Sequence, residues 1–365
     1  MKNESISVLI TLYNHKNYIG EAIESALAQT LAPTEIIVID DASTDGSVAA
    51  ARQHQHPSVR IVEQPRNLGG STTVKGLQMC TGDYVAILNS DDRWDPHKLA
   101  HELDYLRRTP RCGAVFTKVT LIDESGARWR DGEHKLQRIL DQPNRPRTQW
   151  LRHFFNLGNA FCASSAVVRR ECFAKLGPLD GRFIQLQDLE MWVRIAASGY
   201  DLHVIEEPLT DYRVSRRLTN MSAHSDAVRA REIYEYTRLL RNLWRIETVA
   251  ELAEIFPEEA WFAGQPDAIR RFVLAQVASR SPGVHHQQFA VDTMFEAAGD
   301  PACMELAARQ FGFGHIQYRE FMARNPLGTY ATLTVGEMLK ARMGAYMPPA
   351  WVETLRRTKR RLRGA

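Results

Sequence analysis

The first half of the chain predicts an α/β fold with a doubly wound, mainly parallel sheet, and the second half predicts a smaller α-helical domain. Short apolar runs rich in β-branched residues alternate with amphipathic segments up to about residue 120. This pattern is typical of buried parallel strands joined by helices. After about Asn220 no strand-like run recurs, and prolines divide the sequence into helical lengths. We therefore expect two structural units in this order.

The expected elements of the first half follow one another as strand and helix. Strands are expected at 6–12, 36–39, 59–62, 84–88 and 114–116, and helices at 18–29, 47–53, 71–80 and 96–108. Residues 67–70 predict a turn because they end in two glycines. The polar stretch 131–148 contains Pro143 and Pro146 and predicts a flexible loop.

In the second half, helices are expected at 226–246, 268–279 and 289–298, with breaks at Pro257, Pro266, Pro282 and Pro301. We place domain boundaries at 1–222, 223–345 and 346–365, the last segment being a basic tail. Trp351, Leu355 and Leu362 lie among clustered cations in this tail, which favours contact with an anionic membrane surface. A solvated tail and a nucleic-acid contact are the alternatives.

Composition narrows the class of protein. With 365 residues and 44% hydrophobic content the chain can bury one large core or two ordinary ones, and a net charge of +3 makes no general case for nucleic-acid binding. The five cysteines are scattered without a CxxC motif, so we expect neither a zinc site nor a disulfide framework. We expect no signal peptide, and no run approaches the ~20 apolar residues that span a bilayer. A cytoplasmic protein, peripheral on the inner face of the membrane at most, is expected.

Two acidic pairs stand where expected strands end. Asp40-Asp41 follows the strand at 36–39, and Asp91-Asp92 follows the strand at 84–88 after Asn89-Ser90. In open α/β sheets ligands bind outside the carboxyl ends of the strands. Carboxylates at that edge can hold a divalent cation and the hydroxyls of a nucleotide. The pattern indicates an enzyme that acts on a metal-bound nucleotide conjugate.

Residues from about 6 to 222 resemble the inverting family 2 glycosyltransferases of the GT-A fold. The resemblance rests on motifs that occur in the family's order: 11–14 (TLYN), 40–45 (DDASTD), 67–69 (NLG), 89–92 (NSDD), 168–170 (VRR), 177–180 (GPLD) and 187–194 (QDLEMWVR). An Asp-Asp pair alone is common, whereas this many motifs in order are specific.

The resemblance implies a donor site for a nucleotide sugar, with UDP as the expected nucleotide. Thr11, Tyr13 and Asp41 match the positions that hold the base, with Tyr13 placed to stack on a pyrimidine and Asp41 to accept a base N–H. Donor contacts are also expected from Asn14, Asn67, Gly69, Lys75 and Asp91. Thr73-Val74 stands where the family often has Arg-Asn, which leaves Lys75 as the candidate for a diphosphate contact.

Asp92, with Asp91 beside it, matches the family's metal-binding element, so the resemblance implies Mn²⁺ or Mg²⁺ as cofactor. Asn89 replaces the usual first Asp, which leaves Asp92 as the expected direct ligand and Asp91 as a ligand or its neighbour. Because Asp92 is expected on a loop, we expect its replacement to leave the fold intact. Many members have a histidine near residue 215, and here Ser215 stands there, with Arg213, Arg216 and Arg217 as alternative positive charges.

Asp188 matches the family's catalytic base, which takes the proton of the acceptor hydroxyl in a one-step inverting displacement. Gln187 stands where the family usually has Glu, so Asp188 is spared a neighbouring negative charge. Trp192 and Arg194 follow on the same expected helix. Trp192 is a candidate acceptor platform, with core packing as the alternative.

The expected function is transfer of a sugar from a nucleotide-sugar donor to a saccharide or lipid-linked acceptor in cell-surface polysaccharide or lipopolysaccharide synthesis. The helical domain is expected to shape acceptor binding or oligomerisation. A nucleotidyltransferase is one alternative, although 14–18 (NHKNY) is not a glycine-rich phosphate loop. A degenerate sugar-binding or nucleotide-binding scaffold is the other.

Overall fold

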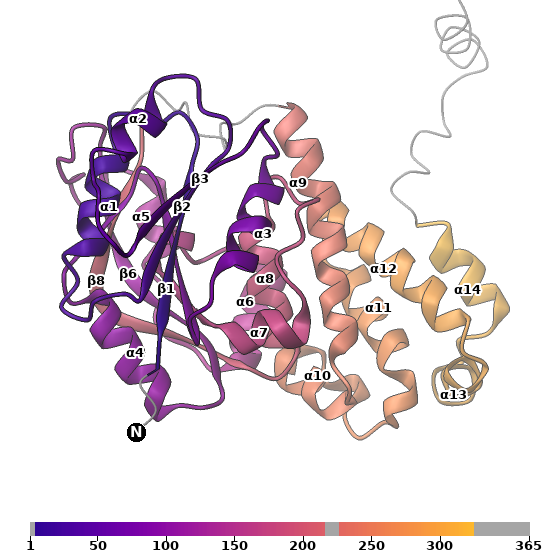
Figure 1. Cartoon of the computed structure of the whole chain (residues 1–365). Helices are drawn as coiled ribbons and strands as arrows, with labels where there is room; N and C mark the ends of the chain where they lie inside the picture. Colours follow the sequence, from indigo (N-terminus) through magenta and orange to yellow (C-terminus); the bar gives the residue numbers. More distant parts are fainter. Residues whose placement is uncertain (1–3, 216–225, 325–365) are drawn as a thin grey trace, which may run out of the picture.

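The structure is a computed structural model that describes residues 4–215 and 226–324. These residues form an eight-stranded sheet with helices on both faces, followed by a helical region packed beyond one of the helical layers (Figure 1). The predicted order, an α/β unit and then an α-helical unit, is confirmed. The basic tail at 346–365, Arg216 and Arg217, and the expected boundary at 222/223 lie outside the described residues.

The sheet is parallel in its first half and mixed in its second. Its strands are β1 (Ile6–Leu12), β2 (Glu35–Asp40), β3 (Val59–Glu63), β4 (Tyr84–Asn89), β5 (Arg93–Trp94), β6 (Cys112–Ile122), β7 (Ala166–Arg169) and β8 (Asp201–Arg213), in the order β3-β2-β1-β4-β7-β6-β8-β5. Strand β7 is antiparallel to β4 and β6, and β5 is antiparallel to β8. The other neighbours are parallel.

The register places both acidic pairs beside the end of β1. Thr11 pairs with Ile39 of β2 on one side and with Asn89 of β4 on the other. The carboxyl ends of these three parallel strands therefore meet at one edge of the sheet, where α/β folds bind their ligands.

Alternate residues of the strands face two different cores. On β1, Val8 and Ile10 belong to one buried cluster with residues of α1 and α4, whereas Leu9 belongs to the other. The helices around the sheet are α1 (Ile19–Leu27), α2 (Ser47–Ala51), α3 (Gly70–Met79), α4 (Lys98–Arg108), α5 (Lys135–Leu140), α6 (Arg147–Leu157), η1 (Ala163–Ser165), α7 (Arg170–Leu176) and α8 (Gln187–Ala197). In Figure 1, α1, α2 and α4 lie on one side of the sheet, and α3, α6, α7 and α8 on the other.

The helical region packs into the buried cluster that contains Leu9, on the side of the sheet covered by α3, α6, α7 and α8. Trp150 of α6 and Trp192 of α8 belong to the same buried cluster as Leu240 and Phe272. Its helices are α9 (Asp226–Leu239), η2 (Leu240–Arg245), α10 (Val249–Ile255), η3 (Pro257–Phe262), η4 (Asp267–Ile269), α11 (Arg270–Arg280), α12 (Val284–Ala298), α13 (Pro301–Phe311) and α14 (His315–Met322). A continuous core means that α8, which starts next to the acidic edge, is supported from behind by the helical region.

Two expectations about local structure are corrected. The stretch 131–148 is not a loop throughout, because α5 lies within it and α6 begins at Arg147, directly after Pro146. A proline just before or within the first helical turn loses no intrahelical hydrogen bond. The strand expected at 114–116 extends over all of β6. None of the helices in the described residues is both long and apolar enough for a membrane span.

Candidate functional site

The loops after β1 and β2 are tied together by hydrogen bonds. The backbone N–H of Asn14 donates to Ser43 Oγ (2.9 Å), and Asn14 Oδ1 accepts from the N–H of Thr44 (2.9 Å). Asn14 and Ala42 have φ values of 52° and 61°, a left-handed conformation that costs free energy outside glycine. Two strained residues held at neighbouring strand ends indicate a preorganised binding loop.

Asp41 holds the glycine turn that begins α3. Its carboxylate, 6% exposed, accepts from the N–H groups of Leu68 (2.6 Å) and Gly69 (2.9 Å) and from the Thr72 hydroxyl (2.5 Å). Asn67 supports the same turn, since its Oδ1 accepts from the Gly69 N–H (3.1 Å). Three donors use three of the roughly four lone-pair sites of a carboxylate. One site remains for a ligand N–H.

Other expected donor residues lie around this turn. Tyr13 follows β1 and is 48% exposed, so its ring is free to stack. Thr11 lies between β2 and β4 in the last part of β1. Lys75 lies on the exposed side of α3, where its Nζ donates to Gln64 Oε1 (2.9 Å). The structure therefore gathers Thr11, Tyr13, Asn14 and Asp41 at one edge, and Lys75 beside it.

Asp92 is not a loop residue exposed to solvent. It is fully buried, and its carboxylate accepts from the Arg213 N–H (2.8 Å), the Ser164 hydroxyl (2.5 Å) and Asn89 Nδ2 (3.3 Å). Burial raises the pKa of Asp92 well above its usual range, and the Asp91 charge adds to the rise. The expectation that Asp92 can be replaced without structural cost does not fit this burial, because the side chain joins β4, η1 and β8.

Asp91 is the more open member of the pair. Its side chain is 25% exposed, and its Oδ2 lies 3.9 Å from His15 Nε2, while His15 Nδ1 contacts Ser90 Oγ at 2.8 Å. Burial raises the pKa of Asp91, and the neighbouring His15 opposes the rise. His15 follows the TLYN motif directly, but no spacing rule distinguishes it in the sequence.

The acidic pair fits a hard divalent cation. The Asp91 charge helps to raise the pKa of Asp92, so the two neighbouring carboxylates offer oxygen ligands and excess negative charge. Across residues 4–215 and 226–324, no three His, Cys, Asp or Glu side chains are arranged to hold a metal. Cations of the Mg²⁺ type are often bound by one or two carboxylates together with substrate phosphates, which suits this arrangement.

Asp188 lies in the first turn of α8 and is held by two donors. Its Oδ2 accepts from Asn159 Nδ2 (2.7 Å), and its Oδ1 accepts from the N–H of Leu189 (2.8 Å). Burial raises the pKa of Asp188, and these two hydrogen bonds oppose the rise. A half-buried carboxylate with a raised pKa is suited to accepting a proton.

Gln187 connects the start of α8 to the donor turn. Its Nε2 donates to the carbonyl of Gly70 (3.0 Å) and to that of Asp180 (3.3 Å). A Cβ on Gly70 would lie 2.8 Å from this same Nε2 and 2.9 Å from the Phe183 carbonyl oxygen, so only glycine allows the approach. The turn held by Asp41 and the helix that carries Asp188 are thereby in direct contact.

Tyr212 lies among the acidic groups of both halves of the site. Burial raises its pKa well above the usual range, and Cys162, Asp92, Asp91 and Asp188 all add to the rise. The pKa of Cys162 is raised in the same way by burial, Asp92 and Asp188. The charges of Asp91 and Asp92, which follow β4, and of Asp188 in α8 therefore all act on Tyr212, although the sequence separates them widely.

Comparison with known proteins agrees with this geometry. The family model described as glycosyl transferase family 2 matches residues 7–177. The chain carries a family 2 glycosyltransferase domain. An uncharacterised glycosyltransferase of Methanocaldococcus jannaschii is 28% identical over 246 residues, which are 66% of this chain and 79% of that protein.

One further relative is named for the biosynthesis of a polysaccharide, and one solved structure has a similar fold. The amylovoran biosynthesis glycosyltransferase AmsB of Erwinia amylovora is 26% identical over 226 residues, 60% of this chain and 72% of that protein. The crystal structure of S. aureus TarS 1-349 in complex with UDP-GlcNAc has a TM-score of 0.54 and 14% identity, and the alignment covers 90% of this chain and 92% of that chain. This likeness confirms the GT-A-type fold with its helical continuation.

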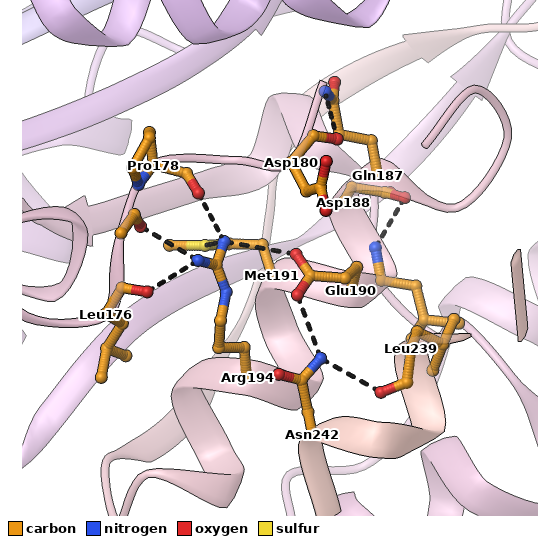
Figure 2. A network of polar contacts seen from close by, with 12 residues as sticks. Leu176, Pro178, Asp180, Gln187, Asp188, Glu190, Met191, Arg194, Leu239 and Asn242 are labelled. Carbon is orange, nitrogen blue, oxygen red and sulfur yellow. Dashed lines mark hydrogen bonds and ion pairs between the residues drawn. The ribbon is translucent and has the colours of Figure 1, made fainter. Parts of the chain in front are cut away.

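The side chains of Arg213 and Arg194 are bound by other groups of the protein. Arg213 is 4% exposed, and its guanidinium donates to the Asp91 carbonyl (2.7 Å), the Asp123 carbonyl (2.9 Å) and Glu21 Oε2 (2.9 Å). Arg194 donates to the carbonyls of Leu176 (2.8 Å) and Pro178 (2.8 Å) and pairs with Glu190 at 3.2 Å (Figure 2). The expected acceptor or diphosphate contacts do not fit this arrangement. Both arginines hold the chain that surrounds the site.

Trp192 belongs to the core. It is 1% exposed and stands edge-on to Phe116, with ring centroids 4.8 Å apart. This burial does not fit an open platform for the acceptor. It fits the alternative that Trp192 packs in the core. Ser215, which stands where many members have histidine, donates to Glu124 Oε1 (2.7 Å).

Sequence reasoning missed the residues that contact the acidic groups, His15, Asn159 and Ser164, and it missed Tyr212, on which their charges act. Ser164 follows no motif, and its hydroxyl reaches Asp92 across 72 positions of sequence. Only three-dimensional proximity identifies such partners. A surface hollow of about 670 Å³ beside Arg52 and His56 lies at the start of β3, away from the carboxyl ends of the strands.

Proposed function

We propose that the protein is an inverting glycosyltransferase that moves a sugar from a nucleotide-sugar donor to a hydroxyl of a saccharide or lipid-linked acceptor. The observation that carries the proposal is the half-buried Asp188, whose carboxylate is held by Asn159 and whose charge acts on Tyr212 together with those of Asp91 and Asp92.

Donor binding is assigned to the edge formed by β1, β2 and the turn 67–70. Tyr13 offers an exposed ring for the base, and Asp41 retains an acceptor site for a base N–H. Thr11, Asn14, Asn67 and Gly69 shape this edge, and Lys75 lies beside it. We propose UDP as the nucleotide because these positions match the base-binding motifs of the family.

Asp91, whose side chain is partly exposed, is the residue that would hold a divalent cation, Mn²⁺ or Mg²⁺, and the buried Asp92 beside it would add negative charge. When bound, such a cation neutralises negative charge on the departing diphosphate. The chain's own contribution is to fix the two carboxylates: Arg213 and Ser164 orient Asp92, and His15 faces Asp91.

In the reaction, the acceptor hydroxyl oxygen forms a bond to the anomeric carbon while the bond from that carbon to the diphosphate oxygen breaks. The nucleoside diphosphate leaves with the electron pair, and Asp188 accepts the hydroxyl proton. Attack from the face opposite the leaving group inverts the anomeric centre.

A donor panel with and without Mn²⁺ tests the proposal. We expect one nucleotide sugar to be consumed in a metal-dependent manner, with release of the nucleoside diphosphate, and NMR of the product to show the inverted anomer. A product with retained configuration would overturn the mechanism. Binding of a nucleotide sugar without turnover on any acceptor would favour the scaffold alternative, and release of pyrophosphate would favour a nucleotidyltransferase.

The acceptor is proposed to belong to a cell-surface polysaccharide. Support comes from the relative in Erwinia amylovora, which is named for amylovoran biosynthesis. Peripheral attachment to an anionic membrane through residues 346–365, and a cytoplasmic location, stay predictions. Co-sedimentation with phosphatidylserine vesicles, with and without these residues, tests the attachment.

A further inference from the structure

The turn that leads into α8 is held by a residue of the helical region. The carboxylate of Glu235, on α9, accepts from the backbone N–H groups of Ile184 (2.8 Å), Gln185 (2.9 Å) and Leu186 (2.9 Å). The next residues along the chain are Gln187 and Asp188, so this contact lies directly before the proposed base.

The Glu235 carboxylate is buried and accepts hydrogen bonds from these three N–H groups. It is 5% exposed, and burying a carboxylate is costly unless it is well hydrogen-bonded. The N-cap residue Leu186 supplies no side-chain hydrogen bond of its own to the helix start. A carboxylate near a helix N-terminus is also favoured by the helix dipole. Glu235 therefore fixes the three backbone N–H groups that lead into α8, the last of which belongs to its N-cap residue Leu186.

A second contact ties the same helix to the same region. Asn242 of η2 donates through its Nδ2 to Glu190 Oε1 (3.0 Å) and to the Leu239 carbonyl (3.1 Å), as Figure 2 shows. Glu190 lies in the first turn of α8, two residues after Asp188. The first turn of this helix is thus anchored from α9 and η2 together.

We propose that Glu235 is a positioning residue that sets the place of Asp188, so that the helical region completes the catalytic machinery. This inference rests on the proposed function, in which Asp188 is the base. Displacing a reacting group by about 1 Å can cost about 10²-fold in rate. Glu235 itself does not contact the donor edge, and Gln187 keeps its own hydrogen bond to the Gly70 carbonyl, so loss of Glu235 should affect turnover far more than donor affinity.

The test compares Glu235→Gln with Glu232→Gln, a matched control one turn earlier on α9. The amide that replaces the Glu235 carboxylate turns an NH₂ group toward N–H donors, so the three-fold contact cannot persist. We expect Glu235→Gln to lower kcat about 10²-fold, with Kd for UDP and Mn²⁺ by calorimetry within about twofold of wild type. Glu232→Gln should match wild type in both.

A double-mutant cycle separates this inference from the proposed function. If Glu235 acts through Asp188, adding Glu235→Gln to Asp188→Asn should cause little further loss. An equal loss in both backgrounds would overturn the inference. Full activity of Asp188→Asn alone would instead overturn the proposed base.

Amide hydrogen exchange tests the contact between Glu235 and residues 184–186 in the wild-type protein, without any substitution. In the wild-type protein with UDP and Mn²⁺, we expect the amides of 184–186 to exchange as slowly as those of α9. If these amides exchange as fast as those of an exposed loop, the hydrogen bonds to Glu235 are absent and the inference is overturned. If Glu235→Gln does not fold, Glu235→Asp keeps the charge and draws the carboxylate back by one methylene, and wild-type kcat in that variant would also overturn the inference.

Discussion

Asn159 donates its side-chain amide to Asp188 Oδ2 over 2.7 Å, across 29 positions of sequence. Its own Oδ1 accepts from the N–H of Phe161 (3.1 Å), which fixes the orientation of the amide toward the carboxylate. The contact stabilises the ionised form of Asp188 and opposes the effect of burial on its pKa.

Removing this donor should shift the pH dependence of turnover. In Asn159→Ala, loss of a hydrogen bond to the ionised form raises the pKa of Asp188, so the base is protonated at higher pH. We expect the acid limb of the kcat profile to move upward and kcat at pH 6 to fall more than at pH 8. Asn156→Ala, at an exposed position at the end of α6, is the control. An unshifted acid limb in Asn159→Ala would contradict the assigned role.

Asp188→Asn keeps the shape of the side chain and removes the proton-accepting charge. General-base assistance is worth about 10²–10⁴ in rate, so kcat should fall by that order, with nucleotide affinity unchanged. Turnover and calorimetry with UDP and Mn²⁺ measure the two quantities separately. Lost nucleotide binding would move Asp188 into the donor site.

Asp91 and Asp92 should behave differently on replacement. Asp91→Asn should abolish metal-dependent transfer with little change in the melting temperature, because Asp91 is partly exposed. Asp92→Ala should also lose stability, since it leaves the Arg213 N–H and the Ser164 hydroxyl unpaired, at about 1–3 kcal/mol each. Thermal unfolding checks this, with the exposed Asp131→Ala as the control. Wild-type activity in excess chelator would contradict the dependence of transfer on a divalent cation.

Gln187→Glu, which restores the usual family residue, should be harmful in this chain. Gln187 donates to two carbonyl oxygens, and a carboxylate there would face them without a proton to share. We expect weaker UDP binding, because the Gly70 turn loses its contact with α8, together with lower kcat. Gln185→Glu, a neighbouring substitution of the same kind, is the comparison. Unchanged UDP affinity in Gln187→Glu would show that the Gly70 contact does not matter.

A stability prediction concerns the buried ion pair of α4. Lys98 Nζ and Glu102 Oε2 are 2.6 Å apart with fully buried side chains, and burial raises the pKa of Glu102 to about 7 while Lys98 opposes the rise. Glu102→Ala leaves the ammonium unpaired and should cost about 3–5 kcal/mol in urea unfolding. Asp104→Ala breaks the exposed pair with Arg108 on the same helix and should change stability by less than about 1 kcal/mol. Similar losses in the two variants would contradict the prediction.

The sequence by itself determined the elements whose signal is local. Apolar runs such as 6–12 and 84–88 predicted β1 and β4 to within a residue, because a strand buried on both faces needs continuous apolar side chains. The acidic pairs at the ends of such strands predicted the edge at which the candidate site is placed. Asp188, Trp192 and Arg194 were expected on one helix, which α8 confirms.

Tertiary structure decided what each side chain does at that edge. Trp192 and Arg194 follow the base in sequence but turn into the core and the supporting chain. Asp92 receives the N–H of Arg213 across 121 positions, and Glu235 holds the turn 184–186 from about 50 positions away. Burial and hydrogen-bond partners arise from packing between distant segments, which a local pattern does not encode. The sequence therefore predicts which chemistry is present, and the fold determines which groups are left free to perform it.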